Sequence, residues 1–63
     1  MSIVLADVFI QQSGNQAYWE ALEQAAYCKH VGNQETMKHF LDAADVLRIR
    51  GYAKHPKKTE RTT

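Results

Sequence analysis

The residues of this chain that could do chemistry are one cysteine, three histidines and seven carboxylates. Cys28, His30 and His39 lack the ligand spacing of a zinc site, and the two histidines do not share a helical i, i+4 spacing. Cys28 falls where two predicted helices meet, and a cysteine there usually acts as a small hydrophobe rather than as a nucleophile. We therefore expect no catalytic residue, no metal and no cofactor.

The central carboxylates do not suggest an acid–base pair. Glu20, Glu23, Asp42 and Asp45 have the spacing of the solvent-exposed faces of two helices. Catalysis would also need a concave pocket, and two helices per chain offer little concavity. The sequence therefore favours a protein that is not an enzyme.

The segment from Tyr27 to Leu41 has the order of a DNA-binding helix-turn-helix, with a glycine between two helical patterns. That motif needs a hydrophobic residue directly after the glycine and another one further into the second helix. The polar residues Asn33 and Lys38 occupy those two positions. Glu35 also places a negative charge where a recognition helix approaches phosphate. We therefore do not favour sequence-specific DNA binding by this segment.

The charge of the chain is divided between its two ends. Residues 1–47 carry two lysines against six carboxylates, net −4, whereas residues 48–63 carry six lysines or arginines against one glutamate, net +5. A basic tail could hold nucleic acid without sequence choice through counterion release, could dock on an acidic protein, or could only keep the chain soluble. The residues assigned to possible partner binding are Arg50, Lys54, Lys57, Lys58 and Arg61.

A predicted helical hairpin organises the chain, with helices at about 15–31 and 34–50. Ser13 and Gln16 have the spacing of a capping box at the start of the first helix. Gly32-Asn33 supplies a left-handed helix end followed at once by a good N-cap. Such a short connection predicts that the two helices lie antiparallel.

Folding the first helix back onto the second predicts a contact in which large residues face small ones. Ala21 meets Ala44 in the middle of this contact, which lets the two backbones approach closely. The eight residues of this hairpin seam are Tyr18, Ala21, Ala25, Cys28, Met37, Phe40, Ala44 and Leu47.

The segment from Ile3 to Ile10 is apolar on every side of a helix, while its β-branched residues mildly favour a strand. No second strand is predicted for it to pair with, so a helix is favoured over the strand. In either form, the segment must pack on the hairpin or on another chain.

A chain of 63 residues is marginally stable alone, and one cysteine cannot form an internal disulfide. Oligomerisation is the remaining way to stabilise so short a chain. We expect a homodimer in which two hairpins form a four-helix bundle. The apolar residues assigned to its interface or core are Val4, Leu5, Val8, Phe9, Trp19, Leu22, Ala26, Leu41 and Val46.

These patterns predict an all-α protein with one helical-hairpin domain, residues 1–53, and a disordered basic tail, residues 54–63. The longest apolar run is interrupted by Asp7 and is too short to span a bilayer, so we expect no membrane partner. A lone cysteine suits a reducing cytoplasm.

Over its whole length, the chain resembles the small early proteins of phage lambda and its lambdoid relatives that are encoded between the exonuclease and excisionase genes. The resemblance runs from the opening MSIVLADVFIQQSGNQAYWEALEQAAYCKH to the closing HPKKTERTT and is carried by length and general character. It implies expression in the cytoplasm of an infected bacterium. It also implies an accessory role, because such proteins are associated with the host cell-cycle state and the balance between lysis and lysogeny. A host or phage regulatory protein is then the expected partner.

Overall fold

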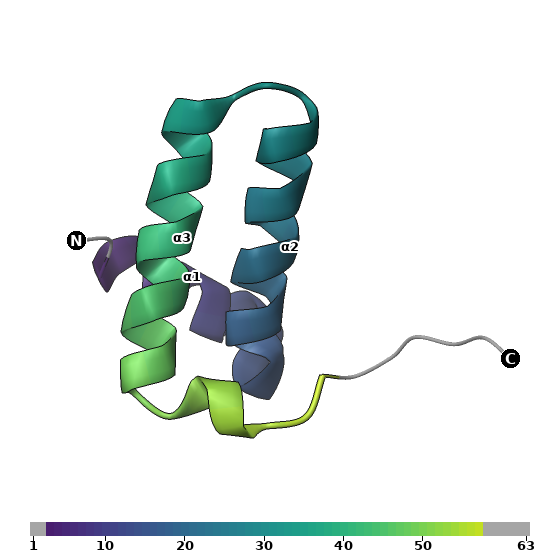
Figure 1. Cartoon of the computed structure of the whole chain (residues 1–63). Coiled ribbons are helices and arrows are strands. Elements are labelled where there is room, and N and C mark those ends of the chain that lie inside the picture. The colour runs from purple at the N-terminus through teal and green to yellow at the C-terminus, as the bar shows by residue number, and fades with distance from the viewer. Residues whose placement is uncertain (1–2, 58–63) are drawn as a thin grey trace, which may run out of the picture.

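The computed structural model describes residues 3–57, and all regular structure among them is helical. The elements in chain order are α1 (Ile3–Ser13), the 3-10 turn η1 (Gly14–Gln16), α2 (Ala17–His30), α3 (Gln34–Ile49) and the 3-10 turn η2 (Tyr52–Lys54). Figure 1 shows α2 and α3 as an antiparallel hairpin, with α1 crossing behind both helices and contacting each of them. The prediction of an all-α fold built on a helical hairpin is confirmed.

The apolar N-terminal segment is α1, so the favoured helical interpretation is confirmed. A helix pairs its backbone polar groups within itself, whereas a strand needs a neighbouring strand that residues 3–57 do not contain. Ala6 and Phe9 are buried on the side of α1 that packs into the core. The ring of Phe9 meets that of Phe40 edge to face, with centroids 5.7 Å apart. This aromatic contact joins α1 to α3.

The start of α2 differs from the prediction. Ser13 is the last residue of α1, and neither Ser13 nor Gln16 forms a side-chain capping hydrogen bond. The chain changes direction at Gly14, whose φ is +55°, and α2 begins at Ala17 rather than at about residue 15. The capping box fails because α1 continues into the serine, which therefore closes one helix instead of opening the next.

The turn between α2 and α3 follows the prediction. Gly32 has φ +82°, and the amide of Asn33 donates to the carbonyl of Cys28 at 2.8 Å, the long hydrogen bond of a Schellman ending. The side-chain Oδ1 of Asn33 then accepts the amide of Thr36 at 3.2 Å and caps α3. One glycine and one asparagine thus reverse the chain and satisfy backbone groups at both helix ends.

Alanine dominates the core. Its members are Ala6, Phe9, Ala17, Ala21, Ala43, Ala44, Val46 and Leu47. Among the described residues, Leu47 is the one large side chain that is fully buried. Because the distance between helix axes depends on the side chains at the contact, alanine lets three short helices pack closely. The resulting core is small, and added volume within it is costly.

The chain continues past α3 with defined contacts, although the sequence places a disordered tail from residue 54. Gly51 has φ +94°, and η2 then turns the chain back toward α2. The indole Nε1–H of Trp19 donates to the carbonyl of His55 at 2.7 Å. The side-chain Nε2 of Gln16 donates to the carbonyl of Pro56 at 2.9 Å. Residues 54–57 therefore hold positions against α2, and the rest of the predicted tail, residues 58–63, lies outside the described part.

Candidate interaction surfaces

All eight residues of the predicted hairpin seam are buried or half-buried. Five of them are buried and three, the larger side chains Tyr18, Met37 and Phe40, are half-buried. Cys28 is among the buried residues and forms no disulfide. Most of these positions are therefore covered by their own chain, while Ala25 and Met37 also line the groove described below.

Several residues assigned to the dimer interface or core are covered by their own chain. Phe9 and Val46 are buried in the core, and Leu5 is half-buried against it. Trp19 is half-buried, stacks edge to face on Tyr18, and donates its hydrogen bond to the C-terminal segment. Phe9 and Val46 thus take the core role of the two roles assigned to this set, and Trp19 lies partly beneath the C-terminal segment.

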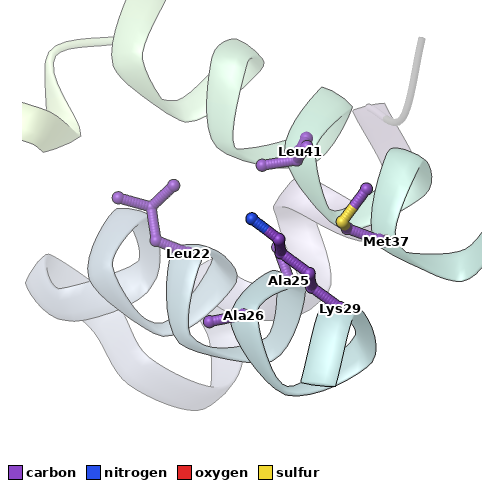
Figure 2. Close-up of a pocket in the computed structure, with 6 residues that line it drawn as sticks. All are labelled: Leu22, Ala25, Ala26, Lys29, Met37 and Leu41. Carbon is purple, nitrogen blue, oxygen red and sulfur yellow. The ribbon is translucent and has the colours of Figure 1, made fainter. Parts of the chain in front are cut away.

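An apolar groove between α2 and α3 collects the predicted interface residues that remain on the hairpin. The groove has a volume of about 370 Å³ and is open to solvent, and Figure 2 shows the residues that line it. Its lining residues are Leu22, Ala25, Ala26, Lys29, Met37 and Leu41. Leu22, Ala26 and Leu41 come from the predicted interface, while Ala25 and Met37 come from the predicted seam. Lys29 was not predicted, because its charge suggests an ordinary solvent-exposed helix end.

A second apolar surface lies on the outer side of α1, and we call it the α1 outer surface: Val4 and Val8. Val4 is 77% exposed and Val8 is 38% exposed, and Ile3 at the start of the helix is 46% exposed beside them. Val4 and Val8 stand one helical turn apart, on the side of α1 opposite to the buried Ala6. Large apolar side chains repeated on one helix face in this way are typical of a contact surface.

Ion pairs neutralise part of the predicted basic region. Arg50 Nη1 donates to Asp7 Oδ1 at 2.7 Å, joining the end of α3 to α1. Lys57 Nζ lies 3.4 Å from Glu23 Oε2. Of the other residues assigned to partner binding, Lys54 is exposed at the end of η2, while Lys58 and Arg61 lie outside the described residues. Of the three described cations in this set, Arg50 and Lys57 are therefore already paired with carboxylates.

Arg48 is also paired on the surface of α3. Its Nη2 donates to Asp45 Oδ1 at 2.7 Å, one turn earlier in the helix. This hydrogen bond, together with the negative charge of Asp45, raises the pKa of the Arg48 guanidinium above its ordinary value. Because the pair is exposed to solvent and joins two turns of one helix, we do not assign it to a binding site.

Residues 3–57 contain no group of three or more His, Cys, Asp or Glu side chains placed to hold a metal ion. Within that range, no helix is long and apolar enough to cross a membrane.

Comparisons of the chain with protein-family models, with curated proteins and with solved structures find no match in any of the three. The groove between α2 and α3 and the α1 outer surface are therefore the candidate sites that the geometry itself provides.

Proposed function

We propose that this protein is a non-enzymatic, homodimeric interaction module that binds a host or phage regulatory protein. The observation that carries the proposal is the presence of two separate apolar surfaces on one small chain. The groove lies between α2 and α3, whereas the α1 outer surface lies on a different helix. A chain with two such surfaces can associate with itself through one and still offer the other to a partner.

The homodimer uses the α1 outer surface in this proposal. The predicted four-helix bundle would draw on Trp19, Leu22, Leu41 and Val46. We favour α1 instead because Val46 is buried in its own chain and Trp19 is half-buried there. Two copies of α1 that cross about a two-fold axis bring Val4 of one chain onto Val8 of the other. A complex at the low end of the stable range buries about 1,200 Å² in total, or roughly 600 Å² per chain. The described chain exposes 4507 Å², so this contact takes a modest share of its surface.

The resemblance to lambdoid early proteins supports the choice of a host or phage regulatory protein as the partner. The resemblance implies an accessory role in the cytoplasm of an infected bacterium, and binding to a regulatory protein is the form of that role that we propose. The absence of a catalytic motif in the sequence fits such a role, as does a surface whose distinguishing features are apolar.

Sedimentation velocity at micromolar concentration tests the homodimer, with a matched pair of valine-to-glutamate variants. Val4→Glu places a charge in the α1 outer surface, while Val31→Glu makes the same substitution at an exposed residue of the turn between α2 and α3. We expect the parent chain and Val31→Glu to sediment as dimers and Val4→Glu as a folded monomer. The melting temperature of the parent should also rise with concentration, because folding and association are coupled. A folded 7.2 kDa monomer with a concentration-independent melt would refute the homodimer.

The alternative function is nucleic-acid binding through the basic C-terminal region. Arg50 and Lys57 already have carboxylate partners, which leaves fewer free cations for phosphate. Titration of duplex DNA at several salt concentrations separates the two functions, because phosphate contacts give an affinity that falls steeply with salt. We expect no measurable binding at physiological salt, and tight binding with a steep salt slope would favour the alternative.

A further inference from the structure

We infer that the groove between α2 and α3 binds an amphipathic helix of a partner protein, and that Lys29 pairs with a carboxylate on that helix. The inference rests on the proposed role as an interaction module and names the surface and the chemistry of the partner. The occupant is described by what the groove can recognise, which is two turns of apolar side chains with one acidic residue beside them.

The walls of the groove have the dimensions of a helix contact. On α2 the lining extends from Leu22 to Lys29, which spans two helical turns or about 10 Å along the axis. On α3, Met37 and Leu41 stand one turn apart. A partner helix laid along this groove places apolar residues at i, i+4 and i+7 between α2 and α3, as in other helix-in-groove complexes.

The floor of the groove explains why the space exists. Ala25 and Ala26 are adjacent on α2, and neither fills the gap beneath the larger Leu22, Met37 and Leu41 (Figure 2). Ala25 is nearly fully buried and Leu41 is 43% exposed, so apolar side chains line the groove from its floor to its rim. A partner side chain that enters the groove replaces water over these residues, which is favourable in proportion to the apolar area covered.

Charge decides which helix fits. Lys29 is the one charged residue in the lining, and in Figure 2 its nitrogen points into the space between Leu22 and Leu41. No carboxylate among the described residues pairs with Lys29, although Glu35 lies near the same end of the hairpin. Lys38, next to Met37 on α3, is exposed and likewise has no ion-pair partner within residues 3–57. This end of the groove therefore favours a helix that carries an acidic residue.

A second copy of this chain fits the groove less well. Its exposed apolar helix is α1, whose one carboxylate is Asp7. Asp7 is already paired with Arg50 at 2.7 Å, so part of its charge is neutralised before it could meet Lys29. Charge complementarity therefore points to a different protein.

The test uses a synthetic helical peptide with leucines at i, i+4 and i+7 and a glutamate at i+3, titrated into the full-length, ¹⁵N-labelled protein. A second peptide with glutamine in place of the glutamate serves as its matched probe. We expect amide shifts confined to the groove residues and a two- to five-fold weaker affinity for the glutamine peptide, the range of an exposed ion pair. Lys29→Gln should weaken binding of the glutamate peptide by the same factor and leave binding of the glutamine peptide unchanged.

Two surface variants keep the result specific to the groove. Leu41→Glu introduces a charge in the lining, while Val31→Glu does the same at an exposed apolar residue of the turn outside it. We expect Leu41→Glu to lose peptide binding by more than ten-fold and Val31→Glu to bind as the parent does. Equal binding by both variants, shifts located on α1, or no binding at millimolar peptide would overturn the inference.

Self-association is tested in the same experiment. If the groove signals of the parent shift on dilution and Leu41→Glu abolishes that shift, the occupant is a second copy and the inference is overturned. Failure of the peptide leaves the Val4→Glu sedimentation result intact, while a monomeric parent leaves the peptide result intact. The groove and the homodimer are therefore judged separately.

Discussion

Ala21→Leu is the sharpest test of how the three helices pack. Ala21 lies on α2 with no exposed surface and belongs to the same core cluster as Ala44 on α3. Leucine adds three carbon atoms where the neighbouring helix already fills the space. Overpacking of this kind typically costs about 1–3 kcal/mol. At about 0.05–0.15 kcal/mol per residue, a chain of 63 residues has a total stability of only about 3–9 kcal/mol, so the change is large.

The matched control is Ala26→Leu, the same substitution on the same helix at an exposed position. It has the same small effect on helix propensity, and the added side chain extends into the open groove. We expect its free energy of unfolding to stay within about 0.5 kcal/mol of the parent. Urea unfolding followed by circular dichroism, at one fixed protein concentration, measures both variants. In a thermal melt, Ala21→Leu should lower the midpoint by at least about 4 °C, because each kcal/mol moves a domain of this size by roughly 4–8 °C. Equal midpoints for Ala21→Leu and the parent would show that α2 and α3 do not pack through this alanine.

Two further predictions concern the ends of the helices. Truncation after Lys57 should leave the free energy of unfolding unchanged. Truncation after Ala53 should lower it by about 1–2 kcal/mol and change the fluorescence of Trp19, because the hydrogen bond from Trp19 to His55 is lost. Identical melts for the two truncated chains would show that residues 54–57 do not stabilise the packing on α2. Gly32→Ala should lower the free energy of unfolding in urea by about 1 kcal/mol, because φ there is +82° and a β-carbon is strained in that conformation even though the surrounding space is open. Val31→Ala, at the neighbouring exposed position, should be nearly neutral. A neutral Gly32→Ala would contradict the left-handed turn.

The hairpin could be predicted from the sequence because its determinants are local. The turn depends on Gly32 and Asn33, and the hydrogen bonds that form it join residues three to five positions apart. The predicted ends at about residues 31 and 50 lie within one residue of the observed ends at His30 and Ile49. The exposure of the helix surface around Asp42 and Asp45 likewise follows from helical periodicity alone.

The capping box shows where local reasoning fails. Ser13 and Gln16 have the correct spacing, but spacing alone does not decide whether a serine opens one helix or closes the one before it. That choice depends on how far α1 extends, and α1 is held by the burial of Ala6 and Phe9 against the hairpin. A contact between helices therefore overrides a sequence signal within a single turn.

The sequence by itself determined the helical class, the antiparallel hairpin and the surplus of apolar residues beyond its seam. Only the tertiary structure decided which of those residues stay exposed. Val46 and Phe9 are covered by helix packing, and Trp19 is covered by a segment 36 residues further along the chain. The pairing of Asp7 with Arg50 joins residues 43 positions apart. Such contacts depend on the directions in which the helices cross, and no periodicity within one helix specifies those directions.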